Sequence, residues 1–462
     1  MSREHHEHLI LGAGVTGLGA GIASGYPIFE ASAYPGGICS SYYVSPGNSR
    51  RLADPGADGE AYRFEHGGGH WIFGGHPDVL SIIERLAPCE RIARKSSVYF
   101  PGEDRFVAYP IQHHLHQLGP QVAARCVGEM LADPSAADVV TMADWLHAQF
   151  GPSLGELFFE PFHDAYTCGL WRSIAPQDGY KTPIDKRLVT QGASGAAPAV
   201  GYNVTFLYPH DGLDALIGRL AAKADVRYES AVVKLHLDRR ELVLGDGRVV
   251  GYRRLLSTLP LNRLVELAGL STQAPSDPYT SVLVLNIGAA RGSRCPDDHW
   301  LYIPRSRAGF HRVGFYSNVQ EHFLPVSGRG RNALTCLYVE RSYVGGEKPD
   351  DATIAGYATQ VVEELREWRW IDRVDALDPS WVDVAYTWAH PGSTWVREAT
   401  AALARHDVSI AGRYARWTFQ GIADSLRDGL LAGQAMRLAA SDEAASGGDC
   451  APGLAPAGGS GS

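Results

Sequence analysis

A short apolar strand, a glycine-rich turn and a small-residue helix at the start of the chain constrain its fold more than any other feature. The strand is residues 8–11, the helix is residues 18–24, and Gly12, Gly14 and Gly17 lie between them in GxGxxG spacing. Gly12 permits the tight turn, Gly14 lets backbone approach a pyrophosphate, and Gly17 lets the helix pack closely on the strand. The helix N-terminus offers N–H groups and partial positive charge to phosphates. The chain therefore begins with the βαβ unit of a dinucleotide-binding domain.

A second short strand follows this helix and ends in an acidic residue. The strand is residues 27–29, and Glu30 stands where a carboxylate that grips an adenosine ribose is expected. The next segment, residues 34–40 (YPGGICS), resembles the glycine-pair loop of amine-oxidase-like flavoproteins, whose backbone passes close to the cofactor. We therefore predict FAD rather than NAD. A plain surface turn of proline and glycine is the alternative interpretation of this segment.

The hydrophobic period of the sequence changes along the rest of the chain. Met142, Leu146 and Phe150 recur at helical spacing, which predicts helix within residues 138–170. Residues 226–250 alternate as a β-meander with a tight turn at Asp246-Gly247 and lead into a buried strand. Other segments predict four strands of a substrate-facing sheet, a late strand and a final helix: 279–285, 300–303, 313–316, 334–340, 408–413 and 423–440.

These elements predict an α/β fold, in which a Rossmann-like FAD-binding domain carries a helical insert and an antiparallel β-sheet substrate domain. At 462 residues the chain exceeds the size at which one hydrophobic core keeps growing, so several subdomains are expected. The predicted parts are 1–75, 196–270 and 389–442 for the FAD-binding domain, 76–116 for a first segment of the sheet domain, 117–195 for the helical domain, 271–388 for the sheet domain and 443–462 for a disordered tail.

Composition narrows the partners and the compartment. A net charge of −9 and a pI near 6.0 argue against a nucleic-acid or anionic-membrane binder, because both need broad basic surface. The sequence has no run of 18 or more apolar residues, so we predict no membrane-spanning helix. Seven cysteines without a CxxC pair predict no disulfide framework and a cytoplasmic location. Two histidine clusters, at 5–8 and 113–116, lack acidic partners at ligand spacing, so we predict no metal site.

Short segments spread in order along most of the chain resemble the UDP-galactopyranose mutase family, particularly its eukaryotic-type members. The most specific is residues 64–73 (FEHGGGHWIF), which resembles the Gly-Gly-His loop that lies against the flavin in that family. Further segments resemble its uracil-binding strand and helix, its sugar-facing sheet and its Gly-Arg motif: 109–112 (YPIQ), 158–163 (FFEPFH), 203–209 (NVTFLYP), 300–304 (WLYIP), 311–318 (HRVGFYSN) and 412–414 (GRY).

The resemblance implies a flavin-dependent nucleotide-sugar mutase. Such an enzyme interconverts the pyranose and furanose forms of a nucleotide-diphosphate sugar through a reduced-flavin N-glycosyl adduct, without net redox. The resemblance also implies that FAD acts in its reduced form, with NAD(P)H as the external reductant. Two phosphates that depart and return suit fixed arginine forks better than mobile lysines.

The resemblance and the nucleotide motif together assign the site residues. Those expected at the reacting centre are His70, Arg187, Tyr302, Arg312, His390 and Arg413. Those expected to bind the substrate are Tyr109, Ile111, Gln112, Phe159, Phe162, His163, Asn203 and Phe419. Those expected to bind FAD, besides His70 and Arg413, are Gly12, Gly14, Val15, Thr16, Gly17, Glu30, Ala31, Gly36, Gly37, Ser40, Gly68, Gly69, Val233, Thr258, Gly412 and Asp424.

The sequence departs from the family at several of these positions. His390 and Phe419 stand where the family places tyrosines that reach the diphosphate, and a phenylalanine cannot donate a hydrogen bond. Phe162 and His163 stand where a tyrosine and an asparagine are more usual. The substrate can therefore carry another sugar or base. The alternative is an oxidoreductase resembling amine oxidases and protoporphyrinogen oxidases, which passes electrons from a small molecule to oxygen.

Overall fold

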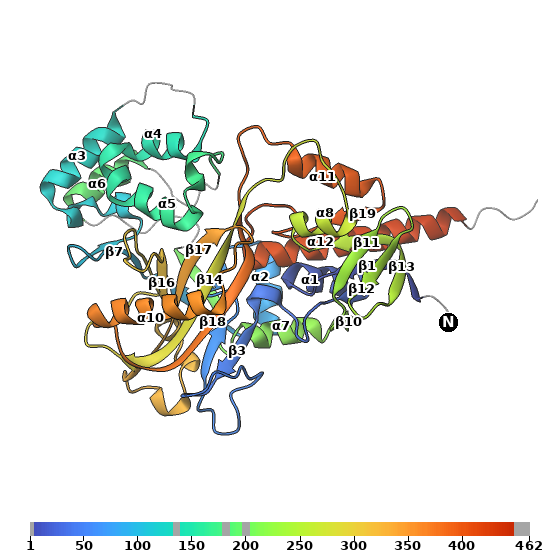
Figure 1. Cartoon of the computed structure of the whole chain (residues 1–462), viewed down its shortest axis with the longest axis horizontal. Coiled ribbons are helices and arrows are strands. Elements are labelled where there is room, and N and C mark those ends of the chain that lie inside the picture. The colour runs from blue at the N-terminus through green and yellow to red at the C-terminus, as the bar shows by residue number, and fades with distance from the viewer. Residues whose placement is uncertain (1–3, 133–138, 178–184, 196–203, 448–462) are drawn as a thin grey trace, which may run out of the picture.

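The computed structural model describes residues 4–132, 139–177, 185–195 and 204–447 (Figure 1). Its first sheet has the strand order β10-β2-β1-β13-β12-β11, with β19 also paired to β13. The strands β10, β2, β1, β13 and β19 pair in parallel, as a dinucleotide-binding sheet requires. These strands are β1 (Glu4–Leu11), β2 (Ile28–Phe29), β10 (Val226–Arg227), β11 (Val232–His236), β12 (Glu241–Leu244), β13 (Val249–Ser257) and β19 (Val408–Ile410).

The predicted meander differs from the observed pairing. Val226 pairs in parallel with Ile28, so β10 belongs to the edge of the parallel sheet and not to the meander. The predicted strands at 249–250 and 255–260 belong to one continuous strand, β13, which ends at Ser257. Its first residues pair antiparallel with β12, while the whole strand pairs in parallel with β1. Hydrophobic alternation cannot show this, because it reports which face is buried and not which strand is the neighbour.

Helices pack together beside the first sheet. Helix α1 (Val15–Ser24) packs against α12 (Ile422–Gly447), the red helix of Figure 1. Nearby lie α2 (Pro77–Leu86), α7 (Leu213–Ala221), α8 (Leu261–Ala268) and α11 (Trp395–Ala404). Two small sheets join this part: β3 (Ser41–Val44) with β4 (Tyr62–Glu65), and β5 (Ile72–Phe73), β9 (Thr205–Pro209) and β6 (Cys89–Ala93). Helix α2 thus packs beside the nucleotide part, although the sequence places residues 76–116 in the sheet domain.

A second large sheet has the order β18-β14-β17-β16-β15-β7-β8, and every adjacent pair is antiparallel except β15–β7. Leu283, Leu285, Leu337 and Val339 face helix α10, whereas the intervening residues face the nucleotide part. This alternation places every second residue of β14 and β17 toward the other domain. The elements are β7 (Ser96–Phe100), β8 (Arg105–Ala108), β14 (Tyr279–Arg291), β15 (Trp300–Tyr302), β16 (Arg312–Phe315), α9 (Tyr316–Val319), β17 (Leu334–Val344), α10 (Asp351–Glu367) and β18 (Ile371–Thr387).

The helical insert stands at one end of the molecule, at the upper left of Figure 1. It contains α3 (Pro120–Leu131), α4 (Met142–Leu154), α5 (Glu160–Thr167) and α6 (Lys186–Ser194). One π-helical turn, Gly155–Phe159, joins α4 to α5. Such turns are frequent at functional sites, because they re-aim the side chains that follow. The predicted helix within 138–170 is confirmed, and so is the predicted α/β class.

The final helix continues beyond its predicted end. Helix α12 runs to Gly447, so the first residues of the predicted tail at 443–462 are helical. Residues 448–462 lie outside the described residues. No helix in the described ranges is long and apolar enough to cross a membrane.

Candidate active site

A cavity of about 500 Å³ lies where the nucleotide part, the large sheet and the helical insert meet. Its lining includes the glycine turn after β1, the loop after β4, the inner face of the large sheet and residues of α5. A volume of several hundred Å³ at a junction of domains is typical of a cofactor or substrate site.

The glycine turn forms one wall of this cavity and fits a pyrophosphate. A Cβ built on Gly14 would meet no atom within 4 Å, so the space above it is open. A Cβ on Gly17 would lie 1.8 Å from the carbonyl oxygen of Gly12, so helix α1 needs glycine there. No side chain caps the start of α1, and its first turn holds no acidic residue. The helix dipole and backbone N–H groups are thus directed at the open space, which suits an anionic cofactor.

Glu30 lies beside this turn at the end of β2. Its Oε2 accepts a hydrogen bond from Ala13 N–H at 2.7 Å, and its Oε1 accepts one from Ser32 N–H at 2.8 Å. Each oxygen has a second lone pair that these bonds leave available. The residue is 9% exposed and is not among the lining residues, so its role toward a ribose stays a prediction.

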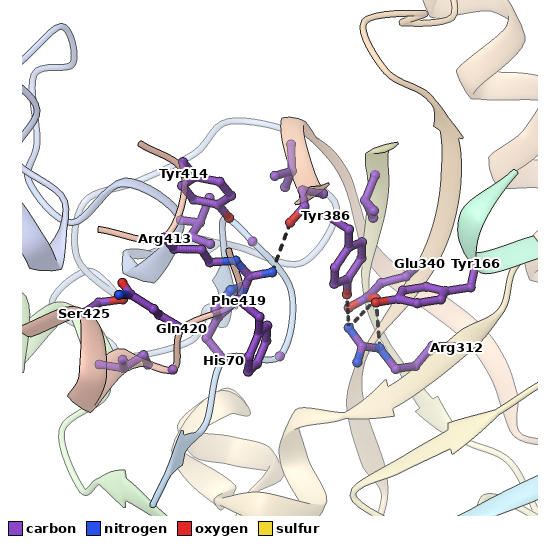
Figure 2. A pocket seen from close by; sticks show the side chains of 18 of the residues that line it. His70, Tyr166, Arg312, Glu340, Tyr386, Arg413, Tyr414, Phe419, Gln420 and Ser425 are labelled. Atoms are coloured by element: carbon purple, nitrogen blue, oxygen red, sulfur yellow. Dashed lines mark hydrogen bonds and ion pairs between the residues drawn. The ribbon is translucent and has the colours of Figure 1, made fainter. Parts of the chain in front are cut away.

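Arg312, Glu340 and Tyr386 form a polar group on the inner face of the large sheet (Figure 2). Arg312 Nε donates to Glu340 Oε2 at 2.8 Å, and Arg312 Nη2 bonds the same oxygen and the Tyr386 hydroxyl, the latter at 3.1 Å. The Glu340 side chain is only 2% exposed. Burial alone would raise the pKa of Glu340, but Arg312 and His311 hold it below its ordinary value. The carboxylate is therefore charged and fixes the guanidinium plane.

The loop after β4 brings His70 to the cavity wall. His70 Nδ1 lies 3.1 Å from the carbonyl oxygen of Gly68, and because a carbonyl only accepts, this nitrogen carries the proton. Burial lowers the pKa of His70 to about 4, and Arg413 adds to this lowering while the Gly68 carbonyl opposes it. His70 is thus a neutral imidazole whose Nε2 is a hydrogen-bond acceptor.

Arg413 follows β19 and lies near His70 and Phe419 (Figure 2). Its Nη2 donates to the Ala385 carbonyl oxygen at 3.1 Å, and its guanidinium carbon lies 4.7 Å from the centre of the Phe419 ring and 5.7 Å from that of Tyr386. Cation–π contacts of this kind hold a guanidinium without neutralising it. Tyr386 thus contacts both arginines, one through its hydroxyl group and one through its ring.

The end of the cavity next to the helical insert is aromatic. Tyr302 lies against Tyr109 and Phe162, with ring centres 4.6 and 5.4 Å apart. His163 Nδ1 lies 2.6 Å from the Phe159 carbonyl oxygen, so it too is the protonated nitrogen. Burial lowers the pKa of His163 to about 4. This end suits a planar, uncharged group that stacks on aromatic rings.

The cavity brings most of the predicted residues together. From the proposed reacting centre, His70, Tyr302, Arg312 and Arg413 line it, and from the proposed substrate set, Tyr109, Phe159, Phe162, His163 and Phe419 do so. From the proposed cofactor set, the lining residues besides His70 and Arg413 are Gly12, Gly14, Val15, Thr16, Gly36, Gly37, Gly69, Thr258 and Gly412.

Other predicted residues lie away from the lining. The Arg187 side chain is 85% exposed and lies 3.9 Å from Asp185, and His390 is exposed, with its backbone N–H bonded to Asp277. Ile111 and Gln112 are wholly buried behind the aromatic end, and Val233 is 54% exposed on β11. Asn203 lies outside the described residues. The remaining cofactor candidates outside the lining are Gly17, Ala31, Ser40, Gly68 and Asp424, together with Glu30.

Sequence reasoning missed two residues of the polar group, Glu340 and Tyr386. Glu340 is an acidic residue at the end of an apolar run in a predicted strand. A buried carboxylate needs a partner, so its position in the sequence could have indicated a nearby cation. Tyr386 lies on β18, which sequence reasoning did not predict. The register of β18 against β14 shifts between Thr280 and Val282, and this irregularity precedes Tyr386.

Within the described ranges, no group of three or more His, Cys, Asp or Glu residues is placed to hold a metal ion.

Comparisons with known proteins identify solved structures of similar fold. A structure of reduced UDP-galactopyranose mutase is similar with a TM-score of 0.79 and 20% identity, over 93% of this chain and 95% of that one. A putative protoporphyrinogen oxidase from Exiguobacterium sp. 255-15 gives a TM-score of 0.67 at 14% identity, over 96% and 100%. Putrescine oxidase bound to putrescine gives 0.56 at 15% identity, over 94% and 99%. At these identities the three structures establish the shared fold.

The family follows from a match that covers most of the sequence. The model of flavin-containing amine oxidoreductases matches residues 26–437. A flavin is thus the cofactor that the family implies, and the open glycine wall fits its pyrophosphate. The chain belongs to the flavin-containing amine oxidoreductase family.

Proposed function

We propose that this chain is a flavin-dependent nucleotide-sugar mutase, which interconverts pyranose and furanose forms of a nucleotide-diphosphate sugar without net redox. The observation that carries the proposal is that Arg312 and Arg413 border one cavity with the glycine turn. FAD, when bound and reduced, supplies the nucleophile. The chain's residues then have to hold a diphosphate that leaves the sugar and returns to it.

Arg312 is suited to that task by its fixed geometry. Glu340 and Tyr386 engage Nε and Nη2, so Nη1 is the nitrogen to which the described part of the chain gives no hydrogen bond. A guanidinium held in one plane gives a charge-assisted bond to a phosphate oxygen at little entropic cost. Arg413 adds a second cation on the opposite side of Tyr386.

The neutral His70 and the aromatic end complete the proposed roles. The Nε2 of His70 accepts a hydrogen bond from a sugar hydroxyl, because its lone pair is free of a proton at neutral pH. Tyr109, Phe162 and Tyr302 form a surface on which a nucleobase stacks. These rings are partly buried, so they limit the access of water to the reacting carbon.

A nucleotide-sugar panel tests the proposal. The flavin-loaded protein is reduced with dithionite or NAD(P)H, incubated with each sugar and analysed by chromatography for pyranose and furanose forms. We expect interconversion with one class of sugar, only in the reduced state and without stoichiometric oxygen uptake. Hydrogen peroxide formed in step with turnover, with no ring contraction, would instead establish an oxidase.

The alternative function is an oxidoreductase that acts on a small molecule. The aromatic end supports it, because three uncharged aromatic side chains line the cavity there: Tyr166, Tyr302 and Trp388. Such a surface binds an apolar substrate as readily as a nucleobase. The similarity to the two oxidase structures supports the same alternative.

A further inference from the structure

The carboxylate of Glu340 has one oxygen that its ion pair does not use. Arg312 Nε and Nη2 both bond Oε2, and His311 Nε2 lies 3.6 Å from the same oxygen. Oε1 has no hydrogen bond within the described ranges, yet it is not sealed from solvent, and Glu340 lines the cavity. Each oxygen of a charged carboxylate can accept two hydrogen bonds. Glu340 Oε1 is therefore an acceptor that a ligand can reach.

This oxygen lies next to the loop that carries His70. A Cβ built on Gly68 would lie 2.9 Å from Glu340 Oε1, so the glycine leaves room that a side chain would fill. The carbonyl oxygen of Gly68 also holds the proton on His70 Nδ1, which leaves His70 Nε2 as an acceptor. Figure 2 shows Glu340 and His70 among the side chains that border one pocket. The loop and the large sheet thus present two acceptors to the same cavity.

Two acceptors on one cavity favour a ligand group that is rich in hydroxyl donors and carries no negative charge. Each sugar hydroxyl group can donate one hydrogen bond, and such a bond is stronger when the acceptor is a charged carboxylate. A carboxylate on the sugar would instead meet Glu340 as a like charge, which opposes binding. Arg312 and Arg413 do not offset this repulsion, because in the proposed function they hold the diphosphate.

We propose that Glu340 is a specificity residue, whose Oε1 accepts a hydrogen bond from a sugar hydroxyl group and rejects sugars that carry a carboxylate. The substrate class is then a nucleotide-diphosphate sugar with an uncharged ring, and not a nucleotide-diphosphate uronic acid. The inference rests on the proposed function, because it takes the sugar to lie between His70 and the arginines. Glu340 thus has two tasks, since it fixes Arg312 through Oε2 and contacts the substrate through Oε1.

The test compares two ligands that differ in one group. UDP-galactose and UDP-galacturonate are the same except at C6, which is a hydroxymethyl group in the first and a carboxylate in the second. Isothermal titration of the flavin-loaded wild type with each ligand measures the two Kd values, and UDP is the reference ligand. We expect the Kd of UDP-galacturonate to exceed that of UDP-galactose roughly tenfold or more, because like charges meet at Glu340.

Two variants show whether Glu340 causes this preference. Glu340→Gln removes the charge and keeps the size of the side chain, so the ratio of the two Kd values should fall below about threefold. A ratio taken within one protein cancels any general loss of anion binding. Glu364→Gln is the matched control and should keep the wild-type ratio. Glu364 is also a buried carboxylate, accepts from Ala308 N–H at 2.8 Å and does not line the cavity.

The outcomes separate this inference from the proposed function. Equal Kd values for the two sugars in the wild type, or an unchanged ratio in Glu340→Gln, would overturn the role of Glu340 while the binding of UDP and of both sugars leaves the mutase proposal standing. If neither UDP nor either nucleotide sugar binds, the proposed function falls and this inference falls with it. The wild-type comparison decides the matter even if Glu340→Gln does not fold.

Discussion

Arg312 and Glu340 are cross-strand partners in the antiparallel pair β16–β17, and their side chains form an ion pair with Nε and Oε2 2.8 Å apart. The pair points toward the nucleotide part because Val313 and Val339, the next residues on each strand, face α10. Gly314 leaves room for the Tyr338 ring beside it, since a Cβ there would lie 2.0 Å from that ring. Strand alternation thus builds the cationic wall of the cavity.

Breaking this ion pair should destabilise the fold. Glu340→Gln leaves a guanidinium that is 24% exposed without its counter-charge, and we expect a loss of about 3 kcal/mol in the free energy of unfolding. The double variant Arg312→Met/Glu340→Gln should recover most of it, because no charge is then buried. Urea unfolding measures both. Arg307→Gln, which breaks an exposed pair with Glu367, should leave the unfolding curve close to that of the wild type. A double variant as unstable as the single one would contradict the prediction.

Two glycines of the turn after β1 should behave differently. Gly14→Ala places its methyl group in open space, so the protein should fold with unchanged melting temperature but bind FAD roughly tenfold or more weakly. Gly17→Ala meets the Gly12 carbonyl oxygen and should lower the melting temperature of the protein without cofactor. Gly218→Ala on α7, where a Cβ meets no atom within 4 Å, is the control. Equal FAD affinity in Gly14→Ala, measured by flavin fluorescence, would argue against a pyrophosphate there.

Buried histidines should make the fold sensitive to acid. Burial lowers the pKa of His163 from 6.5 to about 4. Between these two pH values the unfolded chain binds a proton at His163 and the folded chain does not. Stability is therefore full above pH 6.5 and falls as pH drops toward 4. Between pH 7.5 and 5 the melting temperature of His163→Gln should fall by roughly 2 °C less than that of the wild type. The exposed His5→Gln should follow the wild type. Identical acid profiles in His163→Gln and the wild type would show that His163 is accessible to protons in the folded state.

The two remaining arginine candidates should differ in their effect on anion binding. Arg413→Gln should weaken the binding of UDP by roughly tenfold or more, since a charged hydrogen bond contributes about 1.5–3 kcal/mol. Arg187→Gln should change it less than about twofold, because the Arg187 side chain is 85% exposed. Isothermal titration of the flavin-loaded protein with UDP measures both constants. A large effect at Arg187 alone would restore the role that family resemblance implies for it.

Local features of the chain were readable because they depend on neighbours in sequence. The GxGxxG turn, the helix within 138–170 and the strands at 279–285 and 334–340 follow from spacing alone. The meander was partly wrong, because Val226 pairs with Ile28 nearly 200 residues away, and alternation carries no record of such a partner. The strand β18 was not predicted for the same reason. Its hydrophobic pattern is interrupted, and it forms a strand through its pairing with β14.

By itself, the sequence determined a dinucleotide-binding unit, an α/β class and a set of residues suited to a flavin and an anion. Only the tertiary structure decided which of them meet, for a side chain's surroundings depend on contacts between distant strands. Arg312 lies beside Glu340 and Tyr386 through strand register, while Arg187 remains at the surface and Ile111 lies wholly buried. The charge states of Glu340 and His70 were decided in the same way, since burial and neighbouring charges set the cost of ionising each group.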